Sequence, residues 1–294
     1  MNNIPTQNFI QTIFENKGLN YENDINRPEG TINQAMSKVG INFSPGESSM
    51  KSADTNMEVG GKSATVEVKS HGSAFGQSKY TRDKGVYKVG NPEFGNALAH
   101  YLGGESSNEN VLADPTKRMA HGNKVLNGHL NDHYHNETHG NIDSDHKNDV
   151  GAHWDKVHKA DGEMHLDLHP DRNEAERLLQ HSFHQADKVH IDGHGTYALN
   201  AKASQDHGVP HILDHIDQNE LSSGNVLSVR HRVKTHKTLR DKEGNARLDD
   251  SGTPMRDRNL YLQLNMNKKH LKPSTHDMTT GKGYIKWKRQ QENP

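Results

Sequence analysis

The sequence contains no cysteine, which excludes disulfides, thiolate metal ligands and a cysteine nucleophile. Aromatic residues make up only 5% and hydrophobic residues 30% of the chain, and the mean hydropathy is −1.05. This composition does not favour one core that spans all 294 residues, so we expect a modest folded region with polar, poorly ordered ends. No apolar run approaches the ~20 residues of a membrane-spanning helix.

The N-terminal residues also lack the basic and apolar regions of a cleaved secretory signal. Residues 1–61 are polar and rich in Asn and Ser, with short amphipathic helices expected at 5–17 and 31–39. A leader of this kind resembles the start of bacterial effector proteins that are exported without a cleaved signal. We therefore predict secretion by such a route. An ordinary polar N-terminus, with a cytoplasmic location, is the alternative.

Histidine is unusually abundant, with 23 copies in the chain. The densest run, from His129 to His146, lies in a polar stretch, 105–150, where we expect little core. Neutral imidazoles in such a run can bind zinc or nickel, although their spacing matches no closed structural site. The net charge is −2, so any affinity for nucleic acid must be local. The basic tail, 268–294, interleaves lysines with Tyr284 and Trp287, a pattern that can bind nucleic acid or an anionic membrane, but such tails are more often simply solvated.

Two short segments carry the same alternating pattern and organise our interpretation of the chain. Alternate side chains of a strand share one face. One segment therefore groups His165, Asp167 and His169, and the other groups His190, Asp192 and His194. If the two strands are neighbours, all six side chains lie on a common face.

The sequence between these segments predicts a helix, because Ala175, Leu178, Leu179 and Phe183 follow a helical stripe. A strand, a crossover helix and a second strand form a βαβ unit at 163–195, in which the strands are parallel. Further on, long alternating runs at 225–239 and 259–266 predict a C-terminal antiparallel hairpin. The expected fold class is α/β or α+β, with a small mixed sheet.

Three interpretations of the shared face remain open. A divalent metal such as zinc, held by His165, Asp167, His169 and His190, would activate water for hydrolysis, as in a metal-dependent hydrolase or nuclease toxin. Alternatively, His194, with Asp192 beside it, is catalytic where its strand ends, since open α/β sheets place their sites at strand ends. The third interpretation is a polar sheet face without a catalytic role.

The segment Ile191-Asp-Gly-His-Gly195 resembles the histidine motif of caspase-like peptidases, and among them the autoprocessing cysteine-protease domains of large bacterial toxins. The resemblance covers roughly 163–266. It continues through a basic-faced strand from Val229, glycine turns at Glu243-Gly244 and Ser251-Gly252, and a final strand at Leu260–Leu264. It implies a catalytic role for His194. The nucleophilic cysteine of that family has no counterpart here, so cysteine peptidase activity is not expected.

We therefore expect a leader at 1–61, a core at 62–267 and a basic tail at 268–294. The leading functional prediction is a secreted bacterial effector or toxin-type protein with a His/Asp-lined site around His194, whose catalytic role the sequence leaves open. The alternatives are a metal-dependent hydrolase and a non-catalytic protein that binds a host or partner protein.

Overall fold

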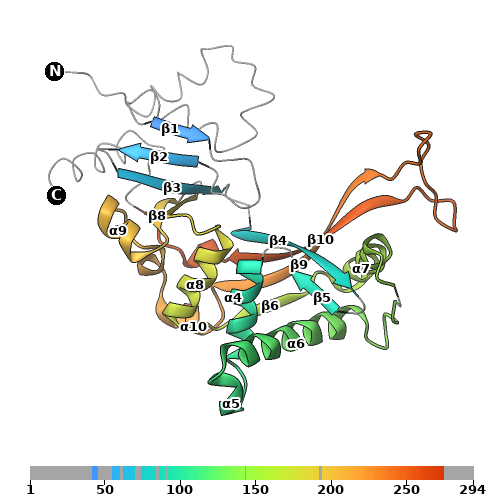
Figure 1. Ribbon diagram of the computed structural model, residues 1–294, viewed down its shortest axis with the longest axis horizontal. Helices are drawn as coiled ribbons and strands as arrows, with labels where there is room; N and C mark the ends of the chain where they lie inside the picture. Colours follow the sequence, from blue (N-terminus) through green and yellow to red (C-terminus); the bar gives the residue numbers. More distant parts are fainter. Residues whose placement is uncertain are drawn as a thin grey trace, which may run out of the picture. The chain divides into compact units, whose positions relative to one another are not determined.

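The computed structural model describes residues 42–45, 55–59, 62–69, 74–83, 86–89, 92–142, 144–191 and 194–274. These residues divide between two compact units (Figure 1). Unit 1 takes the described residues within Met1–Phe75, Asp171–Val226 and Asn267–Pro294, and unit 2 takes Gly76–Pro170 and Leu227–Met266. The two helices expected in the leader, and the tail beyond residue 274, lie outside the described residues.

Unit 1 is built on a mixed five-stranded sheet in the order β1-β2-β3-β7-β8. Its one parallel pair joins β3 to β7, and the other neighbours are antiparallel. The strands are β1 (Asn42–Pro45), β2 (Thr55–Val59), β3 (Lys62–Lys69), β7 (Lys188–Ile191) and β8 (Gly195–Ala198). The alternation of residues 64–69 predicts a half-buried strand, and this prediction is confirmed as part of β3.

Helix α8 (Arg172–Ser182) packs its apolar stripe into the core of unit 1, as the sequence predicted. The Asp171 side chain accepts a hydrogen bond from the backbone N–H of Glu174 and caps its first turn. The apolar residues Ile212, Leu213 and Ile216 predict a single helix from His207 to Leu221, and this prediction is wrong. The chain there forms α9 (Ala201–His207), the 3-10 turn η1 (Ile212–His215) and α10 (Gln218–Ser222), because Gly208 adopts a left-handed conformation and ends α9.

Unit 2 is built on an antiparallel sheet in the order β5-β4-β10-β9-β6. The predicted C-terminal hairpin is confirmed as the pairing of β9 with β10. The strands are β4 (Gly76–Asp83), β5 (Val86–Val89), β6 (His165–Leu168), β9 (Leu227–Thr238) and β10 (Arg256–Met266). The helices of the unit are α4 (Pro92–Gly103), α5 (Glu109–Leu112), α6 (Pro115–Tyr134) and α7 (Lys147–Asp161).

Two of these helices, α6 and α7, fill the stretch in which little core was expected. Helix α6 begins where Asp114 caps the N–H groups of Thr116 and Lys117, and its residues Leu126, Leu130 and Tyr134 are buried at every fourth position. Neither helix was predicted from the sequence, because their remaining positions are polar and histidine-rich. The spacing of four positions between Leu126, Leu130 and Tyr134 is the sequence feature that could have indicated helix α6.

Helices α4 and α6 cross at glycines that allow their backbones to touch. A Cβ built on Gly122 would lie 1.7 Å from the carbonyl oxygen of Ala99, and one on Gly103 would lie 1.9 Å from that of Arg118. Both distances are far inside van der Waals contact. A side chain at either glycine therefore forces the helices apart.

The predicted βαβ unit at 163–195 is wrong in one decisive respect. Its strand, helix and strand all exist, as β6, α8 and β7, but β6 pairs with β9 in the sheet of unit 2 and β7 pairs with β3 and β8 in the sheet of unit 1. The crossover rule applies only to strands of one sheet. The fold nevertheless has the expected class, α/β with helices and a mixed sheet.

Candidate functional site

The first half of the predicted site lies on β6 and faces outward. The imidazole Nε2 of His165 is 2.9 Å from Oδ1 of Asp167, and both side chains are substantially exposed, at 43% and 59%. His169 is exposed as well. The alternation of β6 was therefore predicted correctly, with His165 and Asp167 on this edge strand and His169 directly after it, but their face is open.

The second half lies on β7 in the other unit, where the same pattern is buried. His190 is 4% exposed, and its Nδ1 is 3.0 Å from the hydroxyl of Thr196. His194 lies just beyond the carboxyl end of β7, which pairs in parallel with β3, in the turn that leads to the antiparallel strand β8. Its carbonyl accepts hydrogen bonds from Ser274 N–H and the Tyr197 hydroxyl. Asp192 lies outside the described residues.

The predicted metal set is thus divided between two sheets. His165, Asp167 and His169 belong to unit 2, and His190 belongs to unit 1. Within the part of the chain that the structure describes, no group of three or more His, Cys, Asp or Glu side chains is arranged to hold a metal ion. The expectation of six His/Asp side chains on one shared face is therefore wrong, because β6 and β7 are not neighbours.

The densest set of histidines and aromatic rings lies in the core of unit 2, where α6, α7 and β9 meet. We call Tyr134, Trp154, His158 and His231 the histidine cluster. The Tyr134 hydroxyl lies 2.8 Å from Nδ1 of His231 and is also hydrogen-bonded to Nε2 of His158. Trp154 stacks on Tyr134 with ring centroids 4.3 Å apart and meets His231 edge-on at 4.2 Å.

Burial fixes the protonation of this cluster. His231 is fully buried, and desolvation, followed by the neighbouring His158 and His133, holds its pKa well below the ordinary value of 6.5. Desolvation also lowers the pKa of His158, against the opposing effect of Glu163 and Asp155. Both imidazoles are therefore neutral near pH 7 and can share the single hydroxyl of Tyr134 as donor and acceptor. The cluster joins two helices to a strand.

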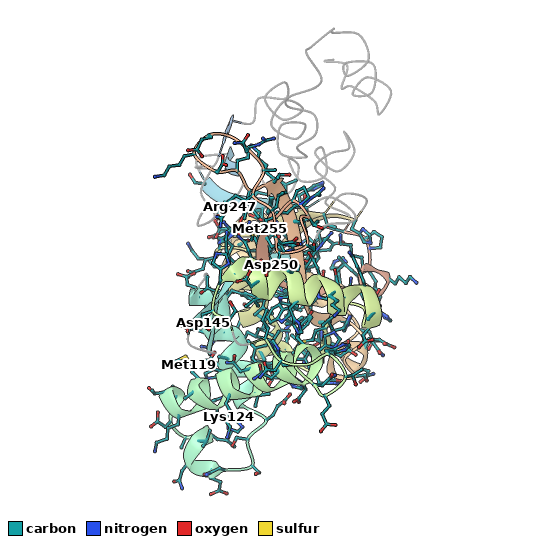
Figure 2. The ribbon with its side chains drawn as sticks, turned by 90° about the vertical axis from the view of Figure 1, so that its right-hand side faces the viewer. Met119, Lys124, Asp145, Arg247, Asp250 and Met255 are labelled. Atoms are coloured by element: carbon teal, nitrogen blue, oxygen red, sulfur yellow. The ribbon has the colours of Figure 1, made fainter. Side chains whose placement is uncertain are left out.

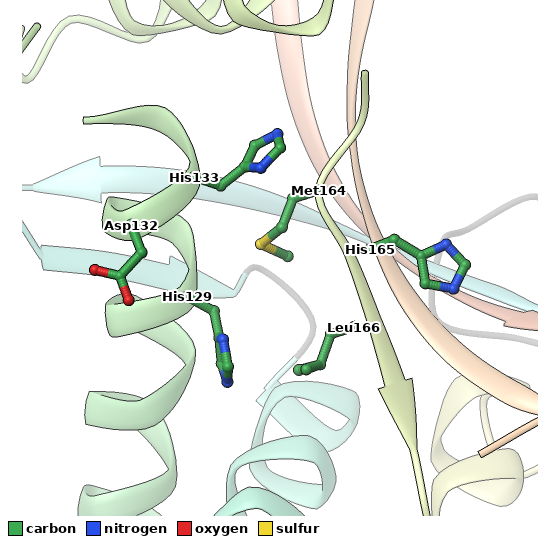
Figure 3. A pocket seen from close by; sticks show the side chains of 6 residues that line it. All are labelled: His129, Asp132, His133, Met164, His165 and Leu166. Carbon is green, nitrogen blue, oxygen red and sulfur yellow. The ribbon is translucent and has the colours of Figure 1, made fainter. Parts of the chain in front are cut away.

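A pocket of about 300 Å³ opens beside this cluster, between α6 and β6. Its lining residues are His129, Asp132, His133, Met164, His165 and Leu166 (Figure 3). Met164 and Leu166 face the helix, whereas the ring of His165 lies on the other side of β6 and Asp132 points away from the strand. Nε2 of His133 is bound to the carbonyl of Gly162 at 3.2 Å. The polar groups thus do not converge on a common point, as a catalytic site requires.

A third feature is the hairpin end beyond β9 and β10, residues 239–255, which we call the arm (Figure 1). Three backbone hydrogen bonds form a closed ring at its centre. The N–H of Leu239 donates to the carbonyl of Met255, the N–H of Met255 donates to the carbonyl of Arg247, and the N–H of Arg247 donates to the carbonyl of Leu239. Their lengths are 2.8, 2.8 and 2.9 Å. The arm is therefore an ordered element in which each of three chain segments bonds to the other two.

The arm contains two turns of the same construction, at 241–245 and 249–253. In each, the first residue is Asp, its N–H donates to the carbonyl of the fifth residue at 2.9 Å, and its Oδ1 accepts from the N–H of that residue. Gly244 and Gly252 hold the fourth position with φ of +86° and +78°, a conformation that favours glycine. The hydroxyl of Ser251, with backbone N–H groups of the turn, lowers the pKa of Asp249.

The base of the arm is anchored to α7. Nε of Arg258 lies 2.7 Å from Oδ2 of Asp155, and the N–H of Arg258 donates to the side chain of Asn148 at 3.0 Å. Lys147 and Asp257 form a further ion pair at 2.7 Å. Gly151 brings α7 close to the strand, since a Cβ there would lie 2.7 Å from Cβ of Arg258.

Side chains at the end of the arm are exposed. Leu248 is 56% exposed. Figure 2 shows the arm end-on, with Arg247, Asp250 and Met255 labelled. Among the described residues, the only other large apolar side chain that is similarly exposed is Leu112, at 39%. From the sequence, residues 239–255 are predicted only as turns, because Asp-x-x-Gly indicates a turn but not that two turns join into one arm.

Comparison of the chain with protein-family models, with curated proteins and with solved structures finds no match. The likeness to caspase-like domains therefore stays a prediction. Within the described ranges, no helix has the length and apolar character needed to cross a membrane.

Proposed function

We propose that the protein is a non-catalytic interaction protein whose arm binds a partner protein. The observation that carries the proposal is the exposed Leu248 on an arm ordered by two Asp-capped turns, a ring of backbone hydrogen bonds and an anchored base. The prediction that the chain is a secreted bacterial effector or toxin-type protein is compatible with this function and stays a prediction.

The physical argument concerns the cost of order. Fixing each backbone residue costs about 1 kcal/mol or more, and an exposed segment recovers little of this by burying apolar surface. The arm has no buried residue from Leu239 to Met255, so its order comes from hydrogen bonds and anchoring alone. A segment that is already ordered when free loses less entropy on binding, which favours affinity.

The chemistry of the arm indicates the kind of partner surface. Leu248 offers an apolar anchor, and it is flanked by Arg247 on one side and by Asp249 and Asp250 on the other. A complementary surface has a small apolar pocket bordered by groups of both charges, as in the polar rim of many protein interfaces. The arm itself has near-balanced charge, which does not favour a uniformly anionic polymer at this position.

The test is affinity purification of partners with the full chain, followed by identification and a binding titration with the purified candidate. Leu248→Asp replaces the anchor, and Leu112→Asp is the matched control at the other exposed leucine. We expect a partner that is retained by the wild type and by Leu112→Asp and lost by Leu248→Asp. Since burying a leucine contributes about 1.5–3 kcal/mol, Kd for Leu248→Asp should rise by at least ~10-fold.

Two results would contradict the proposal. In one, no protein depends on Leu248 for its retention. In the other, both variants lose the same proteins, which would place the interface elsewhere or indicate a general loss of folding. Circular dichroism of each variant separates these causes. Because residue 248 lies outside the core, its substitution should leave the spectrum unchanged, and a changed spectrum would indicate loss of folding.

A further inference from the structure

The sheet of unit 2 has two different faces. Along β9, Arg230, Arg232 and Lys234 alternate with Val229 and His231. The helices contact the side that carries His231, through Tyr134 and Trp154, and the same side of β10, through the bond from Arg258 to Asp155. The arginines and the lysine therefore lie on the opposite side, where Arg230 and Arg232 are exposed.

The strand register extends this positive face across three strands. Arg230 is opposite Gln263, and Arg232 is opposite Tyr261. On the far side of β10, Tyr261 is opposite Lys79, which is exposed. We call Lys79, Arg230, Arg232 and Lys234 the basic face. Acidic groups lie at two places near this face. Toward β6, Oε1 of Glu163 is 4.0 Å from Nε of Arg232, and Asp167 is paired with His165. On β10, Asp257 is paired with Lys147 and also interacts with Lys79 and Tyr261.

Amide and aromatic groups lie between these cations. Nζ of Lys234 donates to the Gln77 side chain at 2.8 Å, and the side-chain amide of Gln263 donates to the same oxygen at 3.2 Å. The ammonium of Lys234 lies 4.8 Å from the ring centroid of Tyr261. Burial, and then the adjacent Arg232, lowers the pKa of Lys234, so an anion placed here would relieve the repulsion between the two cations.

We propose that the basic face binds single-stranded nucleic acid, with phosphates on Arg230, Arg232 and Lys234 and bases over Gln77, Gln263 and Tyr261. Arginine and lysine bind phosphate oxygens. Side-chain amides hydrogen-bond base edges, which are accessible on a sheet face only when the bases are unpaired. Tyr261 is only 6% and Gln263 only 5% exposed, and the ammonium of Lys234 lies over the Tyr261 ring. Stacking on Tyr261 therefore requires Lys234 to turn away to a phosphate.

Fluorescence anisotropy with a labelled oligothymidine of about 20 nucleotides tests the proposal on the full chain, at ~50 mM salt and above. The test variant is Arg230→Ala/Arg232→Ala/Lys234→Ala. The matched control, Lys117→Ala/Lys124→Ala/Lys156→Ala, removes the same charge from exposed positions on α6 and α7. We expect Kd to rise at least ~10-fold for the test variant and less than ~2-fold for the control. For the test variant, the magnitude of the slope of log K against log salt concentration should be smaller by about 2. Each of the three lost phosphate contacts contributes ~0.7 to this slope on single-stranded nucleic acid.

A second variant, Tyr261→Leu, keeps every charge and removes the stacking ring, so it should weaken binding by about 10-fold without changing the salt slope. Absence of binding by the wild type, or equal losses in the two charge variants, would overturn the proposal. Equal competition by polyglutamate would also overturn it and point to an acidic protein on this face. None of these results depends on Leu248, so failure here is distinguishable from failure of the arm to bind a partner.

Discussion

Strands β6 and β7 carry nearly the same sequence pattern and lie in opposite environments. In β6, His165 and Asp167 are exposed on an edge strand. In β7, every residue from Lys188 to Ile191 is buried, in a strand paired on both sides. An alternating pattern thus reports which side chains share a face. The position of the strand within its sheet then decides whether that face meets solvent.

The difference shows most clearly in Lys188. Its side chain is fully buried, and within the described residues its Nζ has no hydrogen-bond partner. Desolvation lowers the pKa of Lys188 from 10.5 to about 7, and Asp187 opposes this only partly. A buried amino group of this kind is a cost to the fold, whereas the polar groups of β6 cost little because water solvates them.

The largest effect in this comparison is expected for Lys188→Met. Removing the buried amine should raise the free energy of unfolding at pH 7 by on the order of 3 kcal/mol, measured by denaturant titration. The folded pKa lies below the unfolded one, so the wild type should lose stability as pH falls from 10.5 towards 7, and the variant should not. The control is Lys202→Met, where the side chain is 90% exposed. A destabilised Lys188→Met protein would show that this amine makes a favourable interaction.

An intermediate effect is expected when the buried imidazoles of unit 2 are forced to take up protons. The pKa values of His158 and His231 are lowered by burial, so the folded state resists protonation that the unfolded chain accepts. Stability is therefore fully present above about pH 6.5 and is lost as pH falls towards the folded values. We expect a loss of up to about 2 kcal/mol per imidazole between pH 7.5 and 5, the limit set by ~1.4 kcal/mol for each pH unit below 6.5. A flat profile over this range would place these imidazoles in contact with water.

The smallest effect is expected on β6 itself. His165→Ala and Asp167→Ala remove an exposed imidazole–carboxylate contact, and exposed pairs of this kind contribute about 0–1 kcal/mol. Each variant should stay within ~0.5 kcal/mol of the wild type in urea titrations, and the acid response described above should be retained in His165→Ala. A loss of several kcal/mol from either change would mean that β6 is not an exposed edge.

Much of the local structure could be predicted from the sequence. Ala175, Leu178 and Leu179 marked α8 by their helical interval, and the alternating runs marked β9 and β10 and their pairing as a hairpin. The strands β6 and β7 were also found in place. Helix α6 was missed, since its buried residues are separated by polar ones and include Gly122, whose role depends on the approach of α4.

The site could not be predicted, because it depended on which strands are neighbours. His165 and His190 are separated by a strand–helix–strand pattern that favours a single sheet, but hydrogen bonding between distant segments decided otherwise: β6 pairs with β9 and β7 with β3. The histidine cluster shows the same limit. Tyr134 and His231 are 97 positions apart in the sequence, and no local pattern relates them.

The sequence by itself determined the absence of thiol chemistry, the helical and strand periods, and the two turns that begin at Asp241 and Asp249. These depend on residue type and on short-range geometry. Only the tertiary structure decided that the chain forms two sheets, that the pattern of β6 is exposed while that of β7 is buried, and that the two turns join into one arm. Those outcomes depend on long-range strand pairing, whose free energy comes from segments that are remote in the sequence.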